Sequence, residues 1–199
     1  MKKYKILAIS DEEILKKYTV EQCKEKFSDV DFILSAGDLS NEYLDYVFTI
    51  LHKDLIYVNG NHVYAKKHNI SFCKNIDGKV IMYKGLKIAG FDGSRIYSFK
   101  EHQYTELEMG IRIAKMIPGF LIRKPDIILT HAPPRKIHDR EEPVHKGFKV
   151  FNRLLKRFKP KLWVHGHIHL GSHFEKQETM VDETRVVNAY GYKVIEIEI

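Results

Sequence analysis

The sequence has little cysteine, and the two residues present form no metal-binding or disulfide motif. Cys23 and Cys73 lie far apart among the 199 residues, each without a second cysteine nearby. A zinc finger or a disulfide framework needs several closely spaced cysteines, so both are excluded. The low count fits a reducing compartment, and we predict a cytoplasmic protein.

Long hydrophobic runs are also missing. No apolar stretch approaches the roughly 20 residues that cross a bilayer, so we expect no membrane partner. The first ten residues, MKKYKILAIS, are basic and then apolar, but the acidic run DEE follows at once. The apolar part is therefore too short for a signal-peptide core. No linker or internal repeat interrupts the chain, which is 44% hydrophobic and 30% charged. We expect one globular domain over residues 1–199.

The chain carries a positive net charge, but the charge is spread out. Its 33 lysines and arginines exceed its 26 acidic residues, giving a formal charge of +7. Such an excess can attract nucleic acid. The lysines are scattered, however, and the densest cluster, Arg153–Lys161, is typical of the solvated face of one helix. We therefore expect a small phosphorylated substrate as the partner rather than nucleic acid. The sequence leaves the oligomeric state open.

Short apolar runs alternate with helical patterns in the first third of the chain. The runs Lys5–Ile9, Asp31–Ser35 and Leu55–Val58 have the length and composition of buried strands. Thr19–Phe27 and the segment after Ser40 predict helices between them. This order favours parallel strand–helix–strand units.

The rest of the chain predicts a second set of elements. The helix expected over Thr105–Ile117 has Leu107, Ile111 and Ala114 on one side, and the C-terminal tail alternates as closing strands do. The pattern as a whole indicates a layered α/β sandwich. The further expected elements are a hairpin, a strand, a helix and a strand, over Val80–Tyr83 with Leu86–Ala89, Asp126–Thr130, Phe148–Phe158 and Leu162–His165.

Metal-binding or acid–base residues follow five of these strand-like runs. Each alone is explained by a turn, or for Asp11 by the start of a helix. In open α/β sheets, however, ligands bind beyond the carboxyl ends of parallel strands, where loops bring distant residues together. The repetition of such residues after five runs, in this order, therefore strongly indicates a common ligand site. The residues are Asp11, Asp38, Asn61 with His62, His131, and His167 with His169.

The segment WVHGHIHLG, residues 163–171, places three histidines at alternate positions. In a strand, residues two apart face the same side, so the three rings can converge. Taken alone, the segment fits either the polar face of a half-buried strand or a metal site, because neutral imidazole is a common metal ligand.

The order of these groups resembles the calcineurin-like metallophosphoesterase superfamily. The resemblance extends from residue 5 to about residue 170 and implies two packed mixed β-sheets flanked by helices, a four-layer sandwich. The matching pieces are SD, GD, GNH, TH and GHIH, at Ser10-Asp11, Gly37-Asp38, Gly60-Asn61-His62, Thr130-His131 and Gly166–His169.

The resemblance also implies a centre of two divalent metal ions. Asp38 would bridge the ions, with Asp11 and His169 on the first. His62 would be the general acid that protonates the leaving oxygen, while His165 lies outside the motif and is interpreted as structural. The second ion would be held by Asn61, His131 and His167.

Such a centre suits hydrolysis of a phosphate ester. Two ions about 3.5–4 Å apart can hold both the attacking and the leaving oxygen, and a bridging hydroxide would attack phosphorus in line. A mixed oxygen and imidazole ligand set suits manganese, which we expect first, or iron, zinc or nickel.

The match breaks in two places. The family usually has Asp-x-His in its first motif, but here Glu13 stands where that histidine is expected. Glu13 is either a ligand of the first metal or a solvated residue at a helix start. The second departure is Val63, where many relatives have an acidic residue that orients the histidine.

Two further segments contain polar residues whose function the motifs do not define. The stretch over residues 132–147 is either a charged solvent loop or a cover over the metals, in which case Arg135, Lys136 and Lys146 could meet a phosphate. Asp92, in GFDGS, is expected to be a turn residue.

The leading hypothesis is a phosphoesterase that acts on a small phosphate mono- or diester. One alternative is a nuclease of the same superfamily, which the positive charge favours weakly. The other is a non-catalytic protein-binding scaffold on this fold, as in a retromer subunit. The presence of His62 argues against the scaffold.

Overall fold

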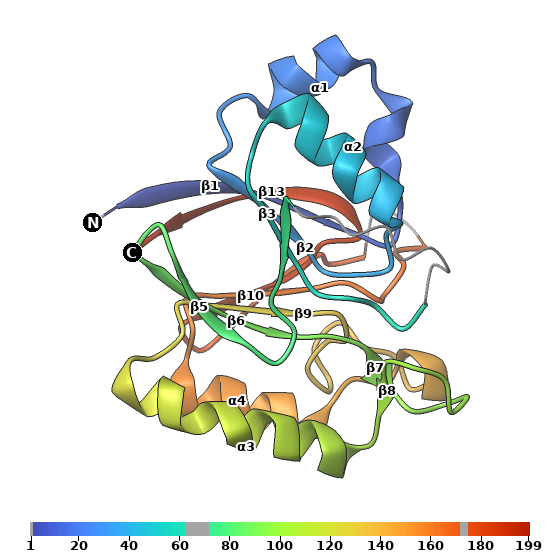
Figure 1. Cartoon of the computed structure of the whole chain (residues 1–199). Helices are drawn as coiled ribbons and strands as arrows, with labels where there is room; N and C mark the ends of the chain where they lie inside the picture. Colours follow the sequence, from blue (N-terminus) through green and yellow to red (C-terminus); the bar gives the residue numbers. More distant parts are fainter. Residues whose placement is uncertain (1, 63–71, 172–174) are drawn as a thin grey trace.

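The computed structural model describes residues 2–62, 72–171 and 175–199. Two β-sheets pack face to face, and two helices cover the outer face of each (Figure 1). This arrangement confirms the predicted α/β fold of two mixed sheets flanked by helices.

The first sheet has the strand order β13-β1-β2-β3-β4. β1 to β4 run parallel to their neighbours, and β13 is antiparallel to β1. The three predicted N-terminal strands are therefore confirmed as parallel neighbours, whereas β4 was not predicted. The strands are β1 (Lys3–Ser10), β2 (Phe32–Ser35), β3 (Leu55–Tyr57), β4 (Cys73–Asn75) and β13 (Gly191–Glu198).

Helices α1 (Val20–Phe27) and α2 (Asn41–Leu51) cover this sheet. The Thr19 hydroxyl accepts a hydrogen bond from the backbone of Gln22, and the Gln22 side chain bonds back to Thr19 in a capping box. Ser40 caps α2 in a similar way. Both helix starts are where the sequence predicts them, and a short 3-10 helix, η1 (Ile14–Lys17), precedes α1.

The second sheet has the order β11-β12-β10-β9-β6-β5, with its four central strands parallel and its two edge strands antiparallel. A separate parallel pair, β7 with β8, and a 3-10 turn, η2, lie in the loops. The elements are β5 (Val80–Tyr83), β6 (Leu86–Phe91), β7 (Ser94–Arg95), β8 (Gln103–Tyr104), β9 (Ile127–Thr130), η2 (Pro143–His145), β10 (Leu162–His165), β11 (Glu178–Val181) and β12 (Thr184–Asn188).

Helices α3 (Glu106–Ile122) and α4 (Lys149–Phe158) cover the second sheet. Helix α3 continues beyond the predicted end at Ile117, as far as Ile122. Leu107 is 73% exposed and Ile111 49% exposed, so the side they share faces solvent. The helix buries the other apolar stripe instead, formed by Met109, Ile113, Met116 and Phe120.

The central core lies between the sheets. Apolar side chains of β1 and β2, such as Ile6 and Leu34, pack against those of β9 and β10, such as Leu129 and Val164, and all four are fully buried. This packing fixes the two sheets relative to each other, so loops after strands of both sheets can meet. None of the helices in the described ranges is both long and apolar enough to cross a membrane.

Candidate metal centre

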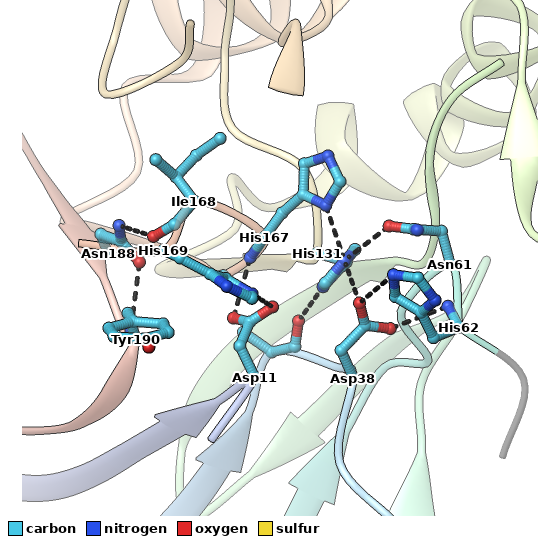
Figure 2. A network of polar contacts seen from close by, with 12 residues as sticks. Asp11, Asp38, Asn61, His62, His131, His167, Ile168, His169, Asn188 and Tyr190 are labelled. Atoms are coloured by element: carbon cyan, nitrogen blue, oxygen red, sulfur yellow. Dashed lines mark hydrogen bonds and ion pairs between the residues drawn. The ribbon is translucent and has the colours of Figure 1, made fainter. Parts of the chain in front are cut away.

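The loops after five parallel strands meet at one place, as the sequence predicts. Figure 2 shows Asp11 and Asp38, carried by the first sheet, facing His131 and His167 from the second. The backbone N–H of His167 donates to Asp11 Oδ2 over 2.9 Å, although the two residues are 156 positions apart. Asp38 Oδ2 lies 3.3 Å from His131 Nε2. The loops of the two sheets therefore form one polar site at the carboxyl ends of their parallel strands.

Tight backbone geometry makes these approaches possible. Asp11, Asp38 and His167 all have positive φ angles, between 53° and 69°, which for residues other than glycine is uncommon and typical of functional loops. Gly60 has no side chain at a point where a Cβ would lie 1.8 Å from Asp38 Oδ1. A Cβ on Gly166 would lie 2.7 Å from Asp11 Oδ2. Both positions require glycine, because the Cβ of any other residue would collide with a carboxylate.

Both central histidines have one ring nitrogen bound to a backbone carbonyl. Nδ1 of His131 donates to the oxygen of Ala36 over 2.8 Å, and Nε2 of His167 donates to the oxygen of Val144 over 2.7 Å. The remaining nitrogens, 3.1 Å apart, face Asp38. Metal-ligating histidines characteristically use one nitrogen in this way, which fixes the ring and leaves the other for the ion. Ligand atoms of Asp38, His131 and His167 lie within 4.8 Å of one another.

Asn61 is held with its amide oxygen toward the same point. Its Nδ2 donates to the Tyr97 hydroxyl, and its Oδ1 lies 2.9 Å from His131 Nε2. Asn61 is 2% exposed. Sequence reasoning missed Tyr97, because no motif marks a tyrosine that orients a ligand from a distant loop.

Asp11 and His169 form the other end of the site. Among the described residues, Asp11 Oδ1 is buried and has no hydrogen-bond partner, and His169 Nε2 lies 3.7 Å from it. The His169 ring packs against Tyr190 at 4.9 Å between centroids. A buried carboxylate oxygen without a donor costs free energy, which a bound cation would relieve. The donor set therefore fits a divalent metal at this end as well.

The pKa values of the cluster also indicate that its carboxylates favour a nearby positive charge. Burial opposes ionisation of Asp38, but His131 and the backbone N–H of His62 lower its pKa to about 2. Burial lowers the pKa of His131, but the Asp38 carboxylate outweighs it and raises the value to about 9. Burial and the charge of His131 lower the pKa of His167 to about 3. A proton on His131 thus supplies positive charge that a metal cation can supply instead.

Both carboxylate oxygens of Glu13 are bound by side chains outside this cluster. Its Oε1 accepts a hydrogen bond from Ser40 Oγ, and its Oε2 is bound by Lys16 Nζ at 2.5 Å. Burial opposes ionisation, but these two partners lower the pKa of Glu13. The geometry favours the second of the two interpretations, a residue at the start of η1. The other departure from the family pattern, Val63, lies outside the described residues.

The stretch over residues 132–147 lies against the site. Besides the Val144 carbonyl on His167, Arg140 donates to the carbonyl oxygen of His169 over 2.8 Å. The basic residues that could meet a phosphate if this stretch covers the metals are paired within the loop. Arg135, Lys136 and Lys146 all contact Glu141. The loop therefore contributes the Val144 carbonyl to the site, and Arg135, Lys136 and Lys146 each have a carboxylate partner.

His62, His165 and Asp92 complete the comparison with the sequence. The His62 ring is 67% exposed and its Nε2 lies 3.8 Å from Asp38 Oδ2. His165 is fully buried at the end of β10, where its Nε2 lies 2.9 Å from the ring of His138. The prediction that Asp92 is a turn residue was wrong. It is 1% exposed and binds side chains of two other elements, because a buried carboxylate needs partners.

Comparison with known proteins identifies the family. A family model of calcineurin-like phosphoesterases matches residues 5–171. The chain therefore belongs to the calcineurin-like phosphoesterase family. Members of this metallophosphoesterase superfamily are generally hydrolases that bind divalent metals. No curated protein matches the sequence.

Solved structures support the fold at low identity. One solved chain shares 17% identity and a TM-score of 0.69, with 99% of each chain covered. TT1561 of Thermus thermophilus shares 19% identity and a TM-score of 0.66, over 96% of this chain and 90% of that one. A hypothetical protein of the same organism shares 12% identity and a TM-score of 0.56, over 92% and 75%. At these identities the likeness shows the fold alone.

Proposed function

We propose that this protein is a metal-dependent phosphoesterase that hydrolyses a small phosphate mono- or diester. The observation that carries the proposal is the placement of Asp38, His131 and His167. Three buried ligand-type side chains converge, and each ring keeps one nitrogen free of backbone contacts.

We assign two divalent ions to the site, with Asp38 shared between them. Asp11 and His169 would hold the first ion. When bound, the ions supply Lewis acidity and lower the pKa of an attacking water to about 7. Manganese is the first expectation, with iron, zinc or nickel as alternatives. The ligands of the second ion would be Asn61, His131 and His167.

Beyond the ligands, His62 is the residue placed to handle the leaving group. Its backbone N–H donates to Asp38 Oδ1 over 2.9 Å, which fixes the residue beside the cluster while the ring stays 67% exposed. An exposed imidazole at the rim can reach a leaving oxygen and give it a proton.

The proposal is tested on protein stripped of metal and reloaded with Mn²⁺, Ni²⁺, Zn²⁺ or Mg²⁺. We expect metal-restored hydrolysis of 4-nitrophenyl phosphate or bis(4-nitrophenyl) phosphate. Two bound metals without turnover of either ester would indicate a more demanding substrate. No bound metal and no turnover would favour the scaffold alternative, and salt-dependent binding of DNA would favour the nuclease.

A further inference from the structure

A second buried polar cluster lies beside the candidate metal centre. Asp92, directly after β6, accepts hydrogen bonds from the Tyr104 hydroxyl over 2.9 Å and from Arg112 Nη2 over 3.1 Å. Its second oxygen is bound by Nδ1 of His102. Arg112 also binds Asp77. None of these residues belongs to the family motifs quoted above.

The cluster fixes His102 through its backbone as well as its ring. The φ angle of His102 is 56°, in the left-handed region. Its carbonyl oxygen accepts a hydrogen bond from Ser94 over 3.0 Å in the short pair of β7 with β8. A Cβ on Gly93 would lie 2.1 Å from that same oxygen. A strained, doubly anchored residue is typical of a side chain that must be held in one place.

The charges around His102 favour its protonated form. The hydrogen bond that His102 donates to Asp92 raises the pKa of His102 against the opposing effect of burial, and Asp77 and Glu101 add to the increase. The cluster then contains two negative charges, on Asp77 and Asp92. They are balanced by two positive charges, on the guanidinium of Arg112 and the imidazolium of His102. Burial opposes ionisation of Asp92 too, but His102 lowers its pKa on balance.

His102 lines a cavity that it shares with the candidate metal centre. The cavity has a volume of about 250 Å³, and its lining includes Asp38, His62 and His102. Tyr57 and Leu44 supply an apolar wall. Within the described part of the chain, Nε2 of His102 has no hydrogen-bond partner, because only Nδ1 is used by Asp92. Because His102 lines the cavity, Nε2 is the ring nitrogen left for a ligand there.

We propose that His102 donates a hydrogen bond from Nε2 to an anionic oxygen of the substrate in this cavity and favours phosphate monoesters over diesters. The assignment rests on the proposed function. A monoester near neutral pH carries up to two negative charges and a diester carries one. A charge-assisted hydrogen bond from a protonated imidazole is therefore stronger to a monoester oxygen, which carries more negative charge, than to a diester oxygen. His102 would then determine specificity without acting on the bond that breaks.

The kinetic test compares His102→Gln with the unaltered protein on both nitrophenyl esters. Glutamine keeps an amide donor for Asp92, so the cluster can remain folded. We expect the KM for 4-nitrophenyl phosphate to rise about tenfold or more, as loss of a charged hydrogen bond predicts. The KM for bis(4-nitrophenyl) phosphate should rise much less, and kcat and metal content should stay unchanged. Equal losses on both esters, or no loss, would overturn the proposal.

Lys100→Gln is the matched control. It also removes a positive charge, two residues away, but Lys100 is exposed and does not line the cavity. If the preference for monoesters came from general attraction, both variants would reduce it alike. We expect only His102→Gln to do so.

A second readout does not depend on turnover. Proton NMR of the His102 ring, with Zn²⁺ present, should give a pKa above the ordinary 6.5, and 20 mM inorganic phosphate should raise it further. If the protein binds no metal and hydrolyses neither ester but phosphate shifts His102, the proposed function fails while the anion contact stands. A His102 titration that phosphate leaves unchanged would refute the contact.

Discussion

Asp38 is the residue on which the contacts of the candidate metal centre converge. Its carboxylate accepts from the backbone of His62 and lies 3.3 Å from His131, while it is only 6% exposed. Loss of its negative charge would leave His131 without the carboxylate that raises its pKa, and would leave the two proposed ions without the ligand that we assign to both. We therefore expect substitution of Asp38 to affect both proposed metal positions.

Also at the scale of single residues, substitution of His62 should affect catalysis without affecting metal binding. In His62→Gln we expect turnover to fall by about 10²–10⁴, the usual contribution of a general acid, while metal content stays unchanged. Metal analysis of the assayed sample supplies the check. Unaltered turnover would remove His62 from the mechanism.

Glu13 gives the complementary prediction. Because its oxygens are taken by Ser40 and Lys16, Glu13→Gln should leave the metal stoichiometry unchanged. The change should cost at most about 1 kcal/mol of unfolding free energy, as expected for a partly exposed pair. Loss of one metal per chain in this variant would instead establish Glu13 as a ligand.

At the scale of the elements, close approach of loops explains why two glycines stand beside the carboxylates. Gly60→Ala places a Cβ 1.8 Å from Asp38 Oδ1, so the loop or the carboxylate must move, and we expect metal affinity to fall sharply. Gly119→Ala in α3 is the control. Its Cβ meets only Val80, at 4.0 Å, and a helical alanine should stabilise the fold by about 0.5–1 kcal/mol. Calorimetric metal titration of both variants distinguishes a local clash from a general effect of added bulk.

Substitutions in helix α3 test which of its two apolar stripes belongs to the core. Ile113 is 8% exposed and Ile111 is 49% exposed. Ile113→Ala should cost about 2–5 kcal/mol of unfolding free energy and Ile111→Ala less than about 0.5 kcal/mol. Chemical denaturation measures both, and equal costs would contradict the packing described above.

These elements also show how far the sequence alone could be interpreted. Capping residues and strand runs placed α1, α2 and the N-terminal strands correctly, since these signals are local. The face of α3 was not predictable, because both of its stripes are apolar and only packing against β6 and β9 decides between them. The same holds for Asp92, whose burial depends on Tyr104 and Arg112 from other elements.

The candidate site was largely accessible to sequence reasoning because its side chains follow strand ends, and strand ends meet in this kind of sheet. What the sequence lacked was the contact partners. Tyr97 on Asn61 and the Val144 carbonyl on His167 come from loops with no recognisable pattern. A cytoplasmic location and a single domain over residues 1–199 stay predictions.

At the scale of the whole molecule, the cluster of Asp77, Asp92, Arg112 and His102 should make stability depend on pH. Glu101 also raises the pKa of His102, and the Tyr104 hydroxyl donates to Asp92. Folding raises the pKa of His102, so its contribution to stability is fully present below pH 6.5 and is lost as the pH rises through the folded value. Denaturation of the unaltered protein from pH 6 to 9 should show this loss, and His102→Gln should show less of it. Parallel curves for the two proteins would contradict the assignment.

The central claim is that one set of side chains both holds divalent metal and makes the protein a phosphoesterase. It is tested most directly by measuring metal content and hydrolysis of both nitrophenyl esters on the same reloaded samples of the unaltered protein and of Asp38→Asn. The account predicts two metals and turnover in the unaltered protein, and loss of both in the variant at unchanged secondary structure. Full turnover in a variant that has lost its metals would contradict it.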